Sequence, residues 1–395
     1  MTSVSSSQPS LHQCQDCGRA QCQCPLEASR DRINRGLQSH SRRDLLNGCR
    51  RFVPKKELFD VLTRKTVAKH LRLFFKGDDD LGNVLAARVA PYDLETCSCH
   101  KIECTGRRVI FASLLQIGRE DYMPIVCQSG AGFCDSSLPF RHDTLSRLQS
   151  DGRLTLTKQE YDLLESGQGQ LRYHHLNRLH IAEGPVVELY DGACLPLSNL
   201  EHYDDVKKKQ SNSSHTVTRI TVLRHHHSLD NGSDDFVLKT FRNPLDTQDA
   251  RSDFEVELRA NRQAPRHDRI VPLLSAFEFR NGFHLVFPLA AQRDLRSVWE
   301  NKKSAEVPGY SARWLLTECI GVAEAVAAIH GPDSLLLHLD IKSANILCFE
   351  STTGGQVSLK LKLSDFGISR TLDELHHIEE YTNTYSPQSV DPWTT

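Results

Sequence analysis

Residues 338–347 read His338-Leu-Asp-Ile-Lys-Ser-Ala-Asn-Ile-Leu347. This stretch carries a carboxylate at Asp340, an amine at Lys342 and an amide at Asn345. A carboxylate next to a reacting hydroxyl group can accept its proton, and an amide oxygen can bind a hard metal ion. The spacing brings these groups onto one short loop, which is the most specific chemical signal in the chain.

A second stretch, Leu363-Ser-Asp-Phe-Gly-Ile-Ser369, follows and supplies the carboxylate of Asp365. The alternating residues 357–363 before it predict a strand that pairs with the segment after Asn345, across a turn at 352–355. Asp365 would then stand close to the first stretch, where two oxygen ligands suit Mg²⁺.

Two weaker elements lie upstream. Residues 236–241, Phe-Val-Leu-Lys-Thr-Phe, predict a strand with Lys239 inside it, and residues 254–258 predict the start of a helix with acidic side chains. Lys239 could reach the phosphates of a nucleotide, although a single lysine in a strand is more often a solvated residue. Either glutamate of the helix, Glu255 or Glu257, could equally be an ordinary surface residue.

In this order the four elements resemble the eukaryotic-type protein kinase domain, over roughly residues 195–388. The resemblance implies an α+β, protein kinase-like fold with a β-rich N-terminal lobe and a partial helical C-terminal lobe. It also implies a phosphotransferase that uses ATP and Mg²⁺, of the Ser/Thr type because Lys342 follows Asp340 by two residues. The pattern Phe-x-x-Glu before His267-Asp-Arg-Ile-Val271 favours Glu257 over Glu255 as the partner of Lys239.

The resemblance assigns a role to each polar residue of the motifs. Residues that would bind ATP include a hinge pair that offers backbone hydrogen bonds to adenine and an aspartate that faces the ribose. The assignments are catalytic Asp340 and Lys342, metal-binding Asn345 and Asp365, phosphate-anchoring Lys239 held by Glu257, hinge Leu289 and Ala290, back-pocket Phe287, and ribose-facing Asp294.

The glycine-rich loop of the family has no counterpart here. No glycine occurs between Gly192 and Gly232, and the aligned positions are about Gln210, Asn212 and His215. Side chains at these positions would obstruct the close approach of backbone amides to phosphate, so nucleotide affinity should be weakened.

Two further departures lie in the second half. Leu339 replaces the arginine that usually receives a phosphorylated activation loop, which argues against regulation by that route. Residues 384–388, Thr-Tyr-Ser-Pro-Gln, resemble the end of the activation segment, and the chain stops seven residues later. We therefore expect a kinase-like domain over 195–395 that is truncated after the activation segment and exposes apolar surface.

The N-terminal half of the chain has fewer patterns from which structure or function can be predicted. Residues 1–55 have nine Lys or Arg against four Asp or Glu and no sustained period, which predicts a disordered basic tail. Residues 56–180 predict a helix-rich accessory region, with one helix over 56–75, a buried run at 109–117 and a helix over 157–166. Its stretch 134–140 resembles segments that precede kinase-like domains in filamentous-fungal proteins.

Two cysteine clusters could bind zinc. Cys14-x2-Cys17-x4-Cys22-x-Cys24 has enough thiols for a tetrahedral site but lacks separated knuckles, and Cys97-x-Cys99-His100-x3-Cys104 is a similar cluster. Free thiols are the more common interpretation of both. The tract His225-His-His227 is most simply a solvated loop.

Composition and charge limit the kinds of partner and the cellular location that we expect. The chain has 395 residues, a net charge of -2 and 25% charged residues, so charge gives no case for nucleic acid or an anionic membrane as partner. No secretory signal or long apolar run is visible, which predicts an intracellular, cytoplasmic protein. We expect ATP and an unidentified protein substrate as its partners.

Two other functions remain open from the sequence. The missing glycines fit a pseudokinase or truncated interaction module that binds partners, with or without ATP, and does not catalyse phosphotransfer. A basic-tailed scaffold, in which residues 1–180 act, is a third class. Retention of Lys239, Asp340, Asn345 and Asp365 together favours the kinase.

Overall fold

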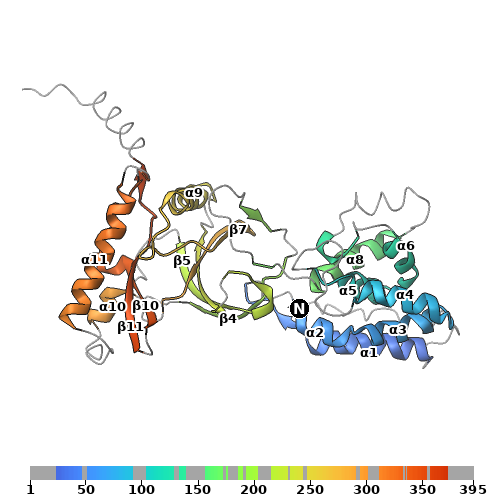
Figure 1. The fold of residues 1–395 in the computed structure, drawn as a ribbon. Coiled ribbons are helices and arrows are strands. Elements are labelled where there is room, and N and C mark those ends of the chain that lie inside the picture. Colours follow the sequence, from blue (N-terminus) through green and yellow to red (C-terminus); the bar gives the residue numbers. More distant parts are fainter. Residues whose placement is uncertain are drawn as a thin grey trace, which may run out of the picture. The chain divides into compact units, whose positions relative to one another are not determined.

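The computed structural model describes residues 24–46, 51–91, 104–128, 133–138, 156–171, 175–176, 186–189, 193–202, 215–229, 232–242, 247–290, 294–300, 311–331, 334, 336–353 and 356–371. They divide into two compact units, and Figure 1 labels several elements of each. The first unit consists of the described residues up to His175 together with 193–196 and 223–226, and the second contains the others.

The first unit is a bundle of short helices. Its helices and small strands are α1 (Pro25–Ser39), β1 (Arg42–Arg43), β2 (Arg51–Phe52), α2 (Lys55–Val61), α3 (Arg64–Phe74), α4 (Asp79–Val89), α5 (Arg108–Gln116), η1 (Glu120–Tyr122), α6 (Met123–Gln128), η3 (Asp135–Ser137), α8 (Lys158–Leu171) and η4 (Arg224–His226). The helix-rich character expected for this part of the chain is confirmed.

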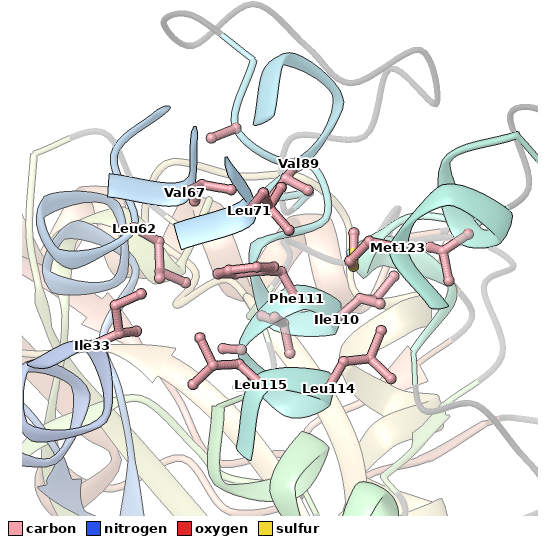
Figure 2. Close-up of a cluster of buried hydrophobic side chains, with 14 of the residues drawn as sticks. Ile33, Leu62, Val67, Leu71, Val89, Ile110, Phe111, Leu114, Leu115 and Met123 are labelled. Carbon is pink, nitrogen blue, oxygen red and sulfur yellow. The ribbon is translucent and has the colours of Figure 1, made fainter. Parts of the chain in front are cut away.

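Helix α5 lies at the centre of this bundle. Every residue from Arg108 to Leu115 is buried, which confirms the buried run predicted at 109–117. Figure 2 shows Phe111 of α5 surrounded by apolar side chains of α1, α3 and α4, among them Ile33 and Leu71. Because each fully buried Leu, Ile or Phe contributes about 2 kcal/mol, this core supplies most of the stability of the unit.

The predicted basic tail is wrong for residues 25–39, which form α1. Only Ile33 and Leu37 of this helix are buried, so the apolar period is too sparse to detect in the sequence. The helix is also held by Arg30, whose guanidinium lies 3.0 Å from the carboxylate of Glu120. Tertiary contacts rather than local propensity therefore order this segment.

The single helix predicted over 56–75 is also wrong, because the structure has two. Helix α2 ends at Val61, and Thr63 begins α3 by accepting a hydrogen bond from the amide of Thr66 at 3.1 Å. A threonine N-cap satisfies an amide that the helix itself cannot. The helix predicted over 157–166 is confirmed as α8 and continues to Leu171.

The second unit is built on a six-stranded sheet with the strand order β3-β7-β8-β6-β5-β4. All neighbours pair antiparallel except β3 and β7. The strand predicted over 236–241 is confirmed as β6. The six strands are β3 (Val187–Glu188), β4 (Leu197–His202), β5 (His215–Val222), β6 (Asp235–Phe241), β7 (Ser275–Phe279) and β8 (Gly282–Pro288).

Helices and two-stranded ribbons complete this unit. They are α9 (Thr247–Gln263), α10 (Leu295–Glu300), α11 (Ala312–Ile329), β9 (Leu336–Leu337), η6 (Ser343–Asn345), β10 (Ile346–Thr353), β11 (Gln356–Leu363) and β12 (Arg370–Thr371). The predicted hairpin is confirmed, since β10 pairs with β11 antiparallel. Mixed helices and sheets confirm the α+β class, and no helix in the described parts of the chain is long and apolar enough to cross a membrane.

Because the ring of His284 on β8 is buried, we expect the free energy of unfolding to depend on pH. Its ring is buried, stacks on Phe277 and lies 3.0 Å from the hydroxyl of Thr240, and burial lowers its pKa to about 4. As the pH falls below about 6.5, the unfolded chain takes up a proton that the folded chain does not. The free energy of unfolding should therefore fall by about 2 kcal/mol between pH 7 and pH 5 through this group.

Urea unfolding followed by tryptophan fluorescence measures this effect in the second unit, because the three tryptophans of the chain are Trp299, Trp314 and Trp393. His284→Gln should remove about 2 kcal/mol of the pH-dependent loss. His225→Gln, which changes an exposed histidine, should leave it unchanged. An equal pH dependence in all three proteins would contradict the buried neutral histidine.

Candidate active site

The site is organised around the amine of Lys239. This residue lies on β6, where it pairs with Leu285 of β8, and its side chain is 9% exposed. Its Nζ donates to Oε2 of Glu257 on α9 at 2.6 Å and to Oδ1 of Asp365 at 2.9 Å. Three residues separated by up to 126 positions thus meet at one cation.

Burial and charge set the protonation of these three groups. Burial tends to lower the pKa of Lys239, but the two carboxylates outweigh it and the pKa is raised. Burial raises the pKa of Glu257, whereas the charge of Lys239 holds the pKa of Asp365 below its usual value in spite of burial. At neutral pH the site therefore contains a lysine cation and an ionised Asp365.

The backbone at Asp365 and Gly367 makes this contact possible. Asp365 has a φ of 68°, in the left-handed region. A β-carbon on Gly367 would lie 3.2 Å from Oε2 of Glu257 and 3.3 Å from Oδ1 of Asp365. A side chain at this position would therefore crowd the charged cluster.

The loop at 338–345 forms a second polar cluster. Oδ2 of Asp340 accepts hydrogen bonds from Nζ of Lys342 at 2.7 Å and from Nδ2 of Asn345 at 2.8 Å. Nδ2 of Asn345 also donates to the carbonyl of Asp340 at 2.9 Å. These bonds close the loop on itself and direct a carboxylate, an amine and an amide to one place.

Ser364 joins this loop to the segment that carries Asp365. Its amide and its hydroxyl both donate to the carbonyl of Asn345, each at 2.9 Å. Asn345 and Asp365 are therefore held close together, and both offer oxygen atoms. Such a donor set fits Mg²⁺, which binds protein carboxylates and completes its coordination with water and phosphate oxygens.

His338 is a positioning residue that the sequence assignments left out. Its imidazole is buried, packs 4.9 Å from the ring of Phe366, and its Nδ1 accepts from the amide of Asp340 at 3.3 Å. Its Nε2 therefore carries the proton and donates to the carbonyl of Ser364 at 3.1 Å. Burial lowers the pKa of His338, so the neutral ring keeps both bonds. In the sequence, the position of His338 at the start of the 338–347 motif was the signal that could have identified it.

Because of the backbone conformation of Leu339, we expect a substitution at this position to raise the free energy of unfolding. It has a φ of 61° and is 51% exposed, so it contributes little packing while adopting a backbone conformation that disfavours most side chains. Leu339→Asn should raise the free energy of unfolding by about 1 kcal/mol, because asparagine tolerates this region. Urea unfolding by tryptophan fluorescence measures it, with Ile341→Asn as the control for loss of an exposed apolar side chain. Equal behaviour of the two variants would show that the backbone carries no strain.

The two residues predicted to form the hinge, Leu289 and Ala290, directly follow β8. Ala290 is buried and Leu289 is partly buried. The side chain of Asp294 accepts from the amide and from the hydroxyl of Ser297, both at 2.8 Å, and thereby caps α10. The structure thus shows a helix cap at Asp294, and its contact with a ribose stays a prediction.

An ion pair between Arg269 and Glu318 connects α11 with β11 and was not predicted. The guanidinium lies 3.0 Å from Oε1 of Glu318, and Oε2 of Glu318 accepts from the amide of Leu361 on β11 at 2.7 Å. Gly321 gives the guanidinium room, since a β-carbon there would lie 2.7 Å from its Nε. No local sequence pattern distinguishes such a pair from surface charges.

Several sequence assignments lie outside the described residues. These are the glycine-loop positions Gln210 and Asn212 and the stretch 384–388. His215, the third loop position, begins β5, and its ring lies 5.8 Å from that of Phe241. A positive charge on His215 would lower the pKa of Asp365 further.

Comparison with known proteins agrees with this geometry. The model of the protein kinase domain matches residues 221–389. Similar proteins include a death-associated protein kinase related protein of Drosophila melanogaster, 33% identical over 32% of this chain and 17% of its own length. Others are cyclin-dependent kinase 7 of Dictyostelium discoideum, 30% identical over 32% and 30%, and serine/threonine-protein kinase 33 of Bos taurus, 27% identical over 26% and 20%.

The alignments cover less than a third of the length of these relatives. The matched region contains the lysine cluster and the loop with Asp340. Residues 221–389 of this chain therefore belong to the protein kinase domain family of the eukaryotic type.

Proposed function

We propose that the kinase domain transfers a phosphoryl group from ATP to serine or threonine hydroxyls of a protein, with Mg²⁺. The observation that carries this proposal is the contact of Lys239 with both Glu257 and Asp365. An amine fixed between two carboxylates from different elements is placed to receive nucleotide phosphates, with a metal-binding carboxylate beside it.

Each residue then has a defined task. Asp340 orients the incoming hydroxyl and accepts its proton, and Lys342 faces the negative charge that develops during transfer. Asn345 and Asp365 would hold Mg²⁺, which when bound neutralises charge on the phosphates. The backbones of Leu289 and Ala290 would bind adenine, with Asp294 near the ribose as a second task beside its helix cap.

The choice of serine or threonine rests on Lys342 and on the relative named a serine/threonine-protein kinase. The identity of the protein substrate does not follow from these residues. Because ATP is an intracellular metabolite, an intracellular, cytoplasmic location is part of the proposal.

Binding of Mg²⁺ and ATP tests the nucleotide site. A ligand that binds only the folded state raises stability, by about 2.7 kcal/mol at a concentration a hundred times its Kd. We expect ATP with Mg²⁺ to raise the melting temperature of the second unit, followed by tryptophan fluorescence, and Asp365→Ala to abolish the shift.

Asp268→Ala is the matched control, because it removes an aspartate of the same unit that is 67% exposed. This variant should keep the full shift. A folded wild-type chain that shows no shift with ATP and Mg²⁺ would refute the catalytic function.

A nucleotide-binding or interaction module without catalysis is the second candidate. It is favoured by the side chains at Gln210, Asn212 and His215, where the family has glycines. A module of this class that binds ATP would show the thermal shift, but no incorporation of radioactive phosphate into itself or into a general substrate such as casein. Transfer that depends on Asp340 would exclude it.

A further inference from the structure

The six-stranded sheet carries an added strand at one edge. β3 is the outermost strand there and pairs parallel with β7, with Glu188 opposite Glu278. The amide of Leu189 extends this pairing by donating to the carbonyl of Glu278 at 2.9 Å. Residues 186–189, which we call the edge segment, lie before residue 221, where the match to the kinase domain model begins. The edge segment is therefore an addition to the matched domain.

The two ends of the edge segment are buried more deeply than its middle. Leu189 is 6% exposed, and Val186 packs against an apolar cluster that includes Phe254 of α9 and Phe283 of β8. Val187, between the two ends, is 44% exposed. A tight turn cannot join a parallel strand to its neighbour, so the apolar contacts and the sheet hydrogen bonds keep the edge segment in place.

Charged side chains also connect this edge of the sheet with α9. Nη2 of Arg251 on α9 donates to Oε1 of Glu278 on β7 at 2.9 Å, and Glu278 is the residue that pairs with Glu188. This hydrogen bond raises the pKa of Arg251, and the negative charge of Glu188 adds to the effect. Because the side chain of Arg251 is 46% exposed, the ionic link stabilises the arrangement less than the apolar contacts do.

The face of α9 that packs in the apolar cluster also carries Glu257. Phe254 and Leu258, three residues before Glu257 and one residue after it, belong to the cluster, and the side chain of Glu257 is 2% exposed. The ring of Phe254 stacks on that of Phe283 at 5.3 Å. A shift of α9 away from the sheet would therefore also withdraw the carboxylate of Glu257 from Nζ of Lys239, which lies 2.6 Å away.

We propose that Val186 and Leu189 are positioning residues for the phosphotransfer site, which hold the edge segment, and through it α9, where Glu257 reaches Lys239. The inference rests on the proposed phosphotransfer, because it gives the edge segment a task in that reaction. Departure of the edge segment from β7 would uncover the apolar cluster and loosen α9, while the loop with Asp340 keeps its own hydrogen bonds. The edge segment thus acts on the placement of the nucleotide phosphates.

The rate of phosphotransfer to casein or to the chain itself, measured with the full-length protein, tests the proposal. The double variant Val186→Ser, Leu189→Ser removes both apolar ends and should lower the rate by roughly 10-fold to 10²-fold, the size expected when a reacting group is displaced by about 1 Å. Val187→Ser changes the exposed residue between them and should keep the wild-type rate. Val186→Ile with Leu189→Met keeps apolar side chains of similar size and should also keep it.

Two measurements separate positioning from a general loss of stability. Glu257→Gln should itself lower the rate, and in that background Val186→Ser, Leu189→Ser should cause a further loss of less than about 2-fold, because the edge segment acts through Glu257. Hydrogen exchange without nucleotide should be faster at the α9 amides of the double variant and unchanged in α11. If α11 also exchanges faster, the single variant Val186→Ser, which keeps Leu189, takes the place of the double variant.

The outcomes distinguish the positioning role from the proposed function. An edge variant with the wild-type rate, an equal fold-loss in the wild-type and Glu257→Gln backgrounds, or unchanged exchange of the α9 amides would each overturn the positioning role. Absence of both transfer and the ATP-dependent thermal shift in the wild-type chain would count against the proposed phosphotransfer instead. Hydrogen exchange would then decide by itself whether the edge segment holds α9, because it requires no catalysis.

Discussion

Replacing Lys239 with methionine should lower the free energy of unfolding of the second unit by about 3 kcal/mol in the absence of nucleotide. The side chain of Glu257 is 2% exposed, and the substitution leaves it next to Asp365 with no cation between them. Removing one partner of a buried ion pair costs more than the pair contributes, because the remaining charge stays desolvated. Urea unfolding by tryptophan fluorescence measures the loss.

Two variants make this result specific to the buried pair. Lys360→Met removes an ion pair with Asp268, whose side chain is 67% exposed, and should cost at most about 1 kcal/mol. The double variant Lys239→Met, Glu257→Met should regain a large part of the loss, since no buried charge is left unpaired. Equal stability of Lys239→Met and Lys360→Met would contradict the desolvated pair.

The lysine cluster illustrates what could be predicted from the sequence. The strand that carries Lys239 follows from its β-branched and aromatic residues, and the pairing of Lys239 with Glu257 follows from the resemblance to the kinase family. Such motifs are readable because their chemistry allows few residue types at fixed spacing. The roles of these residues in phosphotransfer stay predictions, although the structure brings the side chains together.

Contacts that arise only in three dimensions were not predictable. Arg269 and Glu318 look like surface charges in the sequence, and only the packing of α11 against β11 buries them. The same holds for Arg30 of α1, because its partner Glu120 is ninety residues away. Local sequence also could not separate α2 from α3, since apolar residues at helical spacing continue on both sides of Thr63, which caps the second helix.

Replacing Asp340 with asparagine should lower phosphotransfer by roughly 10²-fold to 10⁴-fold, the usual contribution of a positioned proton acceptor. Asparagine keeps the shape of the side chain and an oxygen that can accept from Nδ2 of Asn345, so the loop should keep its structure. It cannot accept the proton of an incoming hydroxyl. Incorporation of radioactive phosphate into the chain or into casein measures the rate.

The thermal shift with ATP and Mg²⁺ separates this loss from a loss of binding. Nucleotide binding is assigned to Lys239 and Asp365, which Asp340→Asn leaves intact, so the variant should keep the wild-type shift while losing transfer. Asp268→Asn should keep both, because that aspartate is exposed and distant from these roles. Transfer at the wild-type rate in Asp340→Asn would show that Asp340 is not the proton acceptor, and loss of both properties would show that the loop positions nucleotide as well as substrate.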